Sequence, residues 1–520
     1  MLRIINTTRC IGHKGGEKTK TKKIEIFIAL SILVGMVFLT LSPVLAADDS
    51  LSDSGYPKYQ ADNQNTGQSQ YIGPQNNSTK WNYTIEYQIT QTPSIGPDGT
   101  IYVPVYNSSN NRGNLYALNS DGTLKWNYTL NDGTESVIVG SPAICNDGTI
   151  YLLGQFSNIQ RTYGTLLALN PDGTLKWNYT INDGISVSMY GSPAIGADGT
   201  IYFSGTINPG VAWYVNYYAM NPNGTLKWNY TDTNVDSGAY STSSPAIGPD
   251  GTIYYRVEFM NQGLGNVQHK LVAMNPNGTV KWDNFVPFGT ILYGSPSVAT
   301  DGTIYIAGWF NFAQPTPELL AYNPDGTPKW AYIANEITNG WFQTTPAIAN
   351  DGTIYVGGYR AGVGGMIYAI NPDGTKKWSN LTTYIISFDP VIGADGTLYI
   401  GYGTLHALYP DSTQKWTLNI HPCTAPVIGP DGTLYVGMAN YNSELQPLPG
   451  YSLLAINTSN PINDPTNNTN NTQASNVQAA TTTTTSGNTV GMQTTGAPVV
   501  PLALAIFSVL GGLAATRKKQ

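Results

Sequence analysis

The residues suited to catalysis or metal binding stand singly along this chain. Its 520 residues include 32 acidic residues, four histidines and three cysteines. A hard cation needs about six oxygen ligands, often from several carboxylates. His269, His406 and His421 lack metal-ligand spacing, and the sequence has no nucleophile–base pair, phosphate loop or haem motif. Acids in the predicted loops are scattered singly, for example Glu135, Asp236, Glu258, Glu318, Glu336 and Asp389. We therefore predict no catalytic residues, no metal and no cofactor.

Aromatic and arginine side chains have the more suitable chemistry, which is binding. These residue types are enriched in binding hot spots. Aromatic rings flanked by Asn also suit sugars, which stack their apolar side and hydrogen-bond through their hydroxyls. The candidate binding residues are Trp213, Tyr214, Trp309, Phe310, Trp341, Phe342, Arg112, Arg161, Arg256 and Arg360. Alternatively, the aromatic members only cover the hydrophobic core of the elements that carry them.

The elements that must position these residues are defined by an internal repeat. Asp-Gly-Thr-Ile/Leu-Tyr occurs eight times, at intervals of 36–52 residues, starting at Asp98, Asp147, Asp198, Asp250, Asp301, Asp351, Asp395 and Asp431. A second string, such as Ala168–Trp177, ends in Lys-Trp and comes later in each unit. Asp-Gly between strand-like runs is a strong hairpin signal, because Gly supplies the positive φ of the turn. Each unit therefore predicts four strands, A to D in chain order, from the Ser-Pro-Ala-Ile stretch (A) to the Lys-Trp stretch (D), which is typical of a propeller blade.

The strand count predicts how the ring closes. The last unit ends near Asn457 without a Trp strand, whereas a Trp strand at Lys80–Thr84 precedes the first unit. We expect this N-terminal strand, which contains Trp81, to complete the last blade and remove an exposed sheet edge. The predicted fold is all-β: an eight-bladed β-propeller of four-stranded antiparallel blades over residues 56–458.

The repeat strings and the lead-in Tyr56–Gly67 resemble those of pyrroloquinoline-quinone-type (PQQ-like) propeller proteins. The resemblance implies that one Trp per blade docks against the next blade: Trp81, Trp126, Trp177, Trp228, Trp282, Trp330, Trp378 and Trp416. Dehydrogenases of this family use a vicinal Cys-Cys disulfide, a Trp floor, an Asp base and Ca²⁺ held by Glu and Asn. Here the cysteines are Cys10, Cys145 and Cys423, so we do not expect PQQ or Ca²⁺.

The two faces of such a ring differ in variability. The A–B and C–D turns, which are monotonous Asp-Gly turns, lie on one face (the turn face). The B–C and D–A connections, which carry every length difference, lie on the other (the loop face), and variable loops on a rigid scaffold are the usual place for binding. We predict a non-catalytic propeller that binds a glycan or protein through the loop face. The alternatives are an envelope or membrane-protein assembly scaffold and a quinoprotein dehydrogenase.

Both ends of the chain have the composition of export and anchoring segments. Residues 1–47 are typical of a signal peptide or N-terminal anchor, since a basic region precedes an apolar run and small residues. Residues 459–496 form an Asn/Thr-rich stalk expected to be disordered. The apolar stretch 497–516 predicts a transmembrane helix, with a basic cytoplasmic end at 517–520. This tail resembles those of methanogen surface proteins. We therefore expect an archaeal glycoprotein, exported and anchored on the outer face of the cell membrane.

Other features of the sequence bear on partners. Asn-x-Ser/Thr sequons mark possible glycosylation at Asn82, Asn107, Asn127, Asn178, Asn229 and Asn380. A net charge of −7 provides no basic footprint, which argues against nucleic acid. We expect a monomer.

Overall fold

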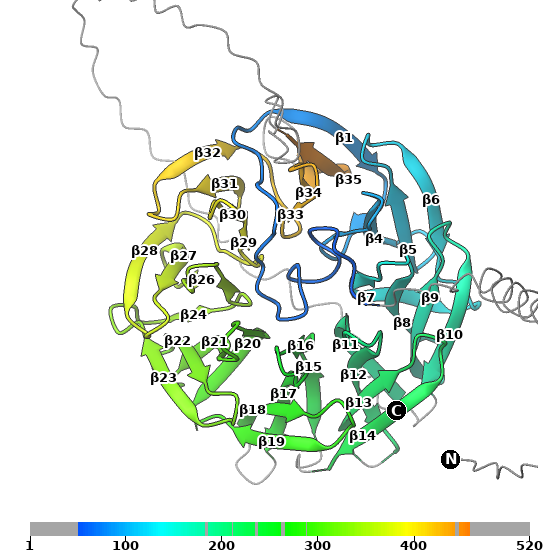
Figure 1. Cartoon of the computed structure of the whole chain (residues 1–520), viewed down its shortest axis with the longest axis horizontal. Coiled ribbons are helices and arrows are strands. Elements are labelled where there is room, and N and C mark those ends of the chain that lie inside the picture. Colours follow the sequence, from blue (N-terminus) through cyan, green and yellow to red (C-terminus); the bar gives the residue numbers. More distant parts are fainter. Residues whose placement is uncertain are drawn as a thin grey trace, which may run out of the picture. The chain divides into compact units, whose positions relative to one another are not determined.

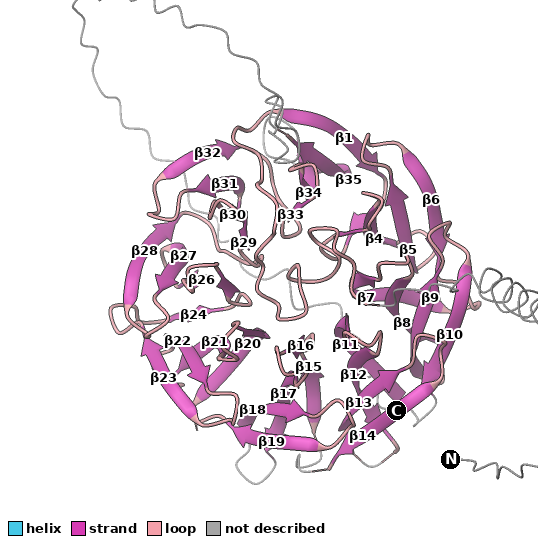
Figure 2. Ribbon diagram, viewed as in Figure 1, coloured by secondary structure: helices cyan, strands magenta, loops and turns pink. Residues whose placement is uncertain are grey.

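The chain forms a closed ring of eight β-sheets (Figure 1; Figure 2). The structure is a computed structural model, and it describes residues 50–181, 186–210, 212–233, 238–261, 266–287, 289–441 and 447–457. Within these ranges the regular elements are all strands, and neighbouring strands of each sheet run antiparallel. The predicted all-β, eight-bladed propeller is confirmed.

Each blade runs from an inner strand A to an outer strand D, and strand A is split in two in blades 1, 4 and 6. Blade 1 contains β2 (Gln88–Ile89), β3 (Ser94–Ile95), β4 (Ile101–Asn107), β5 (Arg112–Leu118) and β6 (Leu124–Thr129). Blade 2 contains β7 (Glu135–Ile144), β8 (Ile150–Ser157), β9 (Thr162–Leu169) and β10 (Leu175–Ile181). Blade 3 contains β11 (Ser186–Ile195), β12 (Ile201–Asn208), β13 (Tyr214–Met220) and β14 (Leu226–Asp232). Blade 4 contains β15 (Ala239–Thr242), β16 (Ala246–Ile247), β17 (Ile253–Asn261), β18 (Asn266–Met274) and β19 (Val280–Phe285).

The second half of the ring repeats this order. Blade 5 contains β20 (Thr290–Val298), β21 (Ile304–Phe310), β22 (Thr316–Tyr322) and β23 (Pro328–Ile333). Blade 6 contains β24 (Gly340–Phe342), β25 (Ala347–Ile348), β26 (Ile354–Arg360), β27 (Gly364–Ile370) and β28 (Lys376–Thr382). Blade 7 contains β29 (Val391–Ile392), β30 (Leu398–Tyr402), β31 (Thr404–Leu408) and β32 (Gln414–Leu418). Blade 8 contains β33 (Val427–Ile428), β34 (Leu434–Tyr441), β35 (Pro447–Ile456) and β1 (Thr79–Ile85).

Blade 8 joins the two ends of the ring. Its strand order is β1-β35-β34-β33, and Trp81 pairs with Ala455 in the β1–β35 ladder. The N-terminal strand therefore completes the last blade, as predicted. Pairing within one sheet protects the edge that β35 would otherwise expose.

The repeated Trp packs each blade against the next. Trp126 of blade 1 donates from Nε1 to the Pro171 carbonyl of blade 2, 2.9 Å away. A Cβ at Gly173, where φ is +85°, would lie 2.6 Å from the Trp126 ring, so only glycine fits this turn. The same bond from Nε1 is made by Trp81, Trp177, Trp228, Trp282, Trp330, Trp378 and Trp416.

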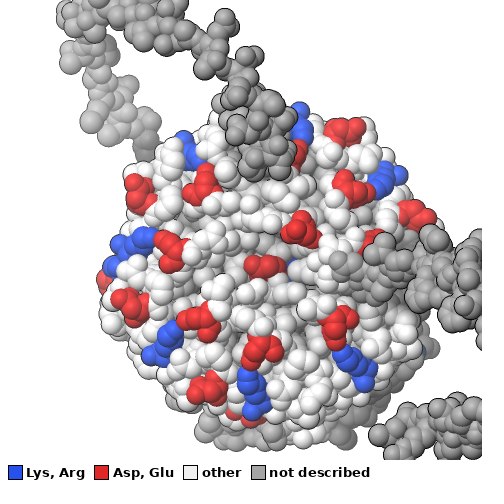
Figure 3. Space-filling view, viewed as in Figure 1, with Lys and Arg blue, Asp and Glu red and all other residues white. Residues whose placement is uncertain are grey.

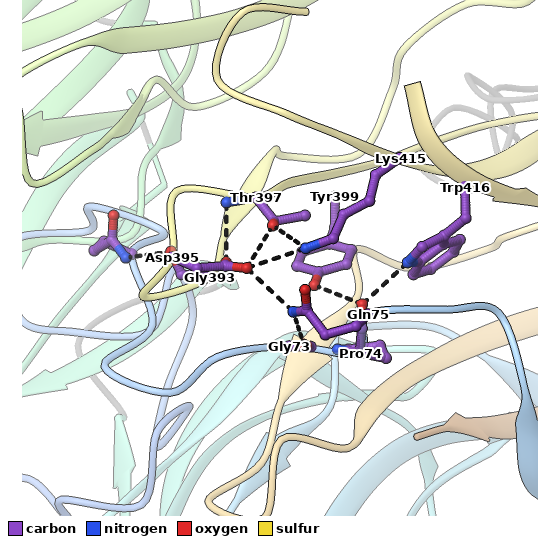
Figure 4. A network of polar contacts seen from close by, with 10 residues as sticks. Gly73, Pro74, Gln75, Gly393, Asp395, Thr397, Tyr399, Lys415 and Trp416 are labelled. Carbon is purple, nitrogen blue, oxygen red and sulfur yellow. Dashed lines mark hydrogen bonds and ion pairs between the residues drawn. The ribbon is translucent and has the colours of Figure 1, made fainter. Parts of the chain in front are cut away.

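Blade 8 lacks a C–D turn, and residues preceding β1 take its place. Trp416 donates to the Pro74 carbonyl at 3.0 Å, and Tyr399 donates to the same oxygen at 3.2 Å (Figure 4). Gln75 donates to Asp395 at 3.1 Å. The seam is therefore held by the same Trp contact as the other blade interfaces, supplied by a different part of the chain.

A segment before β1, here called the central segment (residues 54–69), fills the middle of the ring (Figure 1). Its carbonyls accept hydrogen bonds of 2.6–3.0 Å from the inner strands of six blades, through the amides of Ile95, Ile144, Ile247, Val298, Ile348 and Ile392. Asn63 donates to Ile195 of a seventh blade. These partners directly precede the A–B turns, so the segment closes the channel at the turn face.

The membrane prediction requires correction. Within the ranges that the structure describes, no helix is long and apolar enough to cross a membrane. The predicted location on the outer face of the cell membrane, anchored by a helix over 497–516, is therefore wrong. That prediction rested on the hydropathy of the sequence, and the described residues form no such helix. Residues 497–516 lie outside the described residues, as do the predicted signal peptide at 1–47, the stalk at 459–496 and the basic end at 517–520.

Candidate functional site

A polar funnel opens on the loop face above the central segment. It encloses about 300 Å³ and is lined by the middle of the strand A regions of blades 1–5. Tyr59 of the central segment, Tyr190 and Arg256 also line it. Because the central segment closes the turn-face end of the channel, the funnel is accessible from the loop face.

Arg256 on β17 supplies the positive charge of the funnel. Its side chain is 11% exposed, and its Nε donates to the Gly294 carbonyl of blade 5 at 3.0 Å. Its Nη1 lies 3.4 Å from both Glu258 Oε2 and His269 Nδ1. Burial lowers the pKa of His269 to about 2, and the Arg256 charge acts in the same direction. His269 is therefore a neutral acceptor at Nδ1.

Asp389 supplies a negative charge near the same axis. It occupies the position before the strand A proline, where the other blades carry Thr92, Ser141, Ser192, Ser244, Ser295, Thr345 and Ala425. Thr345 donates its backbone N–H to Asp389 at 2.7 Å, and the Tyr59 hydroxyl bonds Thr345 Oγ1. Burial raises the pKa of Asp389, although these hydrogen bonds oppose the shift.

The hydroxyls at this position link neighbouring blades. Ser141 N–H donates to Ser192 Oγ, and Ser192 N–H donates to Ser244 Oγ, both at 2.8 Å. Ser295 N–H donates to Thr345 Oγ1 at 2.9 Å. Each hydroxyl accepts from a backbone amide and keeps its own proton as a donor. The funnel lining thus combines hydroxyls, phenols and one guanidinium, and the Asp389 carboxyl group lies next to it.

Of the residues predicted to bind, Arg256 alone lines this funnel. The others lie in blades 1, 2, 3, 5 and 6. Phe342 is buried and packs edge-on against Tyr368, so it belongs to a blade core. Trp341 lies 4.6 Å from Tyr359, and Trp309 lies 5.4 Å from Phe312, measured between ring centroids. These contacts stay within single blades, so they do not build one continuous aromatic surface.

The remaining predicted residues are distributed around the rim. Trp213 bridges to Gly238, and Tyr214 is half-buried against the core of blades 2 and 3. Phe310 is exposed. Arg112 donates to Asn131, Arg161 lies 5.3 Å from the Tyr163 ring centroid, and Arg360 is half-buried at the end of β26.

The sequons lie mostly on outer strands. Five of the acceptor residues are exposed: Asn82, Asn127, Asn178, Asn229 and Asn380. Asn107 is only 7% exposed, and its side chain accepts a hydrogen bond from the Ser109 amide. The first five acceptors are therefore sterically more accessible than Asn107.

The repeat aspartates are engaged on the turn face. In every blade the lysine before the Trp pairs with the aspartate of the A–B turn, as in Lys125–Asp98 at 2.7 Å. The other seven pairs are Lys80–Asp431, Lys176–Asp147, Lys227–Asp198, Lys281–Asp250, Lys329–Asp301, Lys377–Asp351 and Lys415–Asp395. Figure 3 shows acidic and basic side chains next to each other around the ring. These carboxylates are therefore committed to structural ion pairs.

The donor set does not fit a PQQ–Ca²⁺ centre. Cys145 is buried beside the chain at Leu51, and Cys423 lies in another blade, so the two form no vicinal disulfide. In the part of the chain that the structure describes, no three His, Cys, Asp or Glu residues are grouped to hold a metal ion. The central segment also occupies the middle of the channel with its own hydrogen bonds.

Comparisons with known proteins support a PQQ-like propeller. A family model described as "Outer membrane protein assembly factor BamB" matches residues 64–213. A second, described as "Domain of unknown function (DUF5122) beta-propeller", matches residues 299–328. A search of curated proteins found no match.

Solved structures with some likeness have low TM-scores. The Dos1 propeller is 8% identical at a TM-score of 0.46, covering 75% of this chain and 98% of that one. A Bacteroides caccae protein of unknown function is 16% identical at 0.33, covering 54% and 93%. A Synechocystis apocarotenoid oxygenase mutant is 12% identical at 0.36, covering 58% and 72%. No inference about function rests on these likenesses.

Proposed function

We propose that this chain is a binding propeller that holds a glycan or protein partner on its loop face and performs no chemistry on it. The funnel carries this proposal. Its charged residue, Arg256, stands where the other blades carry small, apolar or hydroxyl residues, and Asp389 lies beside the funnel through its hydrogen bond from Thr345. A rigid pocket with a few convergent polar groups is the usual form of a ligand site.

The chemistry of the lining favours a glycan. Tyr59 and Tyr190 offer aromatic surface, whereas Arg256 and the serine hydroxyls offer hydrogen bonds to sugar hydroxyls. A volume of about 300 Å³ is at the lower end for ligand pockets. We therefore expect one terminal residue of a glycan to enter the funnel while the rim contacts the remainder.

A glycan array followed by calorimetry with the best ligand tests the proposal. Arg256→Gln should weaken binding about tenfold or more, because charge-assisted hydrogen bonds contribute about 1.5–3 kcal/mol. Arg256→Lys keeps the charge, so it distinguishes a loss of binding from a loss of folding. Lys125→Gln, on the turn face, serves as the control variant. Unchanged affinity in Arg256→Gln would overturn the funnel as the site. Loss of binding only after joint replacement of Trp213, Trp309 and Trp341 by Ala would move the site to the rim.

The BamB-type family match favours a second candidate, a scaffold in protein assembly. In that case the loop face would bind a membrane protein. Crosslinking from a photoreactive residue at position 310 would then capture protein, and the glycan array would show no binding. Capture without array binding would replace the first proposal by the second.

A further inference from the structure

A groove between blades 4 and 5 forms a second cavity, apart from the funnel. It encloses about 550 Å³, within the range of small-molecule sites. One wall is the end of β19 with Phe285 and Pro287, and the other is β22 and β23 with Glu318, Leu320 and Ala331. The groove extends from the C–D turn of blade 5 to Glu318.

A departure from the repeat explains why this blade interface is open. The residue after the blade Trp is Ala331 here, whereas the other blades carry Asn82, Asn127, Asn178, Asn229, Asp283, Ser379 and Thr417. Ala331 pairs across the strands with Leu320, whose side chain packs toward blade 4. The small side chain thus leaves space on the side of the blade that faces the groove.

Glu318 provides a buried charge at the inner end of the groove. It is 4% exposed, and Thr290 Oγ1 donates to its Oε2 at 3.0 Å. Burial raises the pKa of Glu318 to about 7, with the Thr290 bond opposing the shift. Among the described residues, no cation lies within ion-pair distance of this carboxylate. Lys329, the basic residue of the groove lining, instead forms an ion pair with Asp301 and donates a hydrogen bond to Thr303.

The equivalent position of blade 4 shows the opposite arrangement. In each blade one alanine pairs with the blade Trp, and it is Ala273 in blade 4 and Ala321 in blade 5. Lys270 and Glu318 each lie three residues before this alanine. Lys270 is fully buried and lies 2.6 Å from Asp232 of blade 3 and 3.2 Å from Asp283. A buried charge normally requires such partners. Where Lys270 meets two carboxylates, Glu318 faces an open groove.

We propose that this groove binds a small organic cation: a primary amine with an apolar body, whose ammonium group pairs with Glu318. The apolar body would lie against Leu320, Ala331 and Pro287. Phe285, which is 53% exposed, would cover it at the mouth. The chain provides two carboxylates that neutralise Lys270, whereas the ammonium group of the ligand would supply the charge that neutralises Glu318. This site goes beyond the proposed funnel and does not depend on it.

Calorimetry with 2-phenylethylamine, and with 2-phenylethanol as its neutral counterpart, tests this site. We expect the amine to bind with a Kd on the order of 0.1–1 mM and the alcohol about tenfold more weakly. Glu318→Gln, which keeps the shape and the Thr290 contact, should weaken the amine about tenfold or more. Ala331→Asn, which restores the residue that four other blades carry, should abolish binding by filling the groove.

Glu135→Gln, on the rim of blade 2, is the matched control and should leave amine binding unchanged. Thermal unfolding checks that each variant is folded. No heat of binding at about 10 mM amine would overturn the proposal, as would equal affinity in wild type and Glu318→Gln. Equal binding of amine and alcohol would show that the apolar wall acts without the carboxylate, which also contradicts it.

Discussion

Lys80 Nζ lies 2.9 Å from Asp431 Oδ2, although 351 positions separate the two residues in the chain. The pair is the copy in blade 8 of the Lys–Asp contact that each other blade forms within a continuous stretch. Its side chains are 33% and 44% exposed, and exposed ion pairs contribute about 0–1 kcal/mol. Ring closure therefore depends mainly on the β1–β35 ladder and on the docking of Trp416.

Replacing the two kinds of seam contact should have unequal effects. Lys80→Ala should reduce the free energy of unfolding by less than about 1 kcal/mol. Trp416→Ala should reduce it by about 3–5 kcal/mol, since this Trp is buried (8% exposed) and its removal opens a cavity at the seam. Urea unfolding provides the measurement. Trp126→Ala, at a more exposed docking position, is the control; a cost equal to that of Trp416→Ala would contradict a special role for the seam.

Lys58 should be the most sensitive position of the central segment. It is fully buried and its Nζ donates to Tyr59 O, Asp62 O and Asn65 Oδ1 at 2.6–2.8 Å. Lys58→Ala removes all three bonds and leaves the Asp62 carbonyl with the Asn65 amide as its donor, so we expect a loss of roughly 3 kcal/mol in chemical denaturation. Lys125→Ala on the turn face should cost less than about 1 kcal/mol. Similar losses in both variants would show that the central segment is not anchored by Lys58.

Glu318 should make stability depend on pH. Its pKa is raised to about 7 in the folded protein, mainly by burial, so between about pH 4.5 and 7 the folded state binds more protons than the unfolded state. Its contribution to stability therefore falls as the pH rises through this range. The free energy of unfolding of Glu318→Gln should exceed that of wild type by roughly 3 kcal/mol at pH 8. At pH 4 the two proteins should differ little, and urea unfolding at each pH provides the measurement. A variant less stable than wild type at pH 8 would refute this.

His269 should remain neutral in acid. Burial, aided by Arg256, lowers its pKa to about 2, so its ring proton signals should not shift in an NMR titration from pH 8 to about pH 4. Protonation is favoured only in the unfolded state, so this residue lowers stability as the pH falls below its ordinary value of about 6.5. A midpoint above about pH 5 would contradict the described burial.

The sequence predicted the ring because its evidence is local and repeated. Asp-Gly turns and Lys-Trp strands recur in each unit, and the unpaired Trp81 strand indicated the seam. The central segment escaped prediction, because its contacts are backbone hydrogen bonds to strands far along the chain. Nothing in the composition of residues 54–69 encodes those partners.

The funnel was only partly foreseen for a related reason. Arg256 was predicted as a residue beside a loop, yet β17 places it at the channel. Asp389 was treated as an isolated acid, because sequence separation does not show that all eight inner strands converge on one axis. The available signal was its place in the repeat, where most other blades carry Ser or Thr. Phe342 is buried, which agrees with the alternative that an aromatic residue in a loop-face segment covers a blade core.

The contacts of the central segment and β1 also set the order in which this protein can mature. Ribosomal synthesis proceeds at about 5–20 residues per second, so Lys80 precedes Asp431 by roughly 20–70 s. Throughout that interval the first strand has no partner and the wall around the central segment is incomplete. Completion of the propeller is therefore a late event that waits for the synthesis of β35, and a chain stalled before blade 8 would present an unpaired β1 to other molecules.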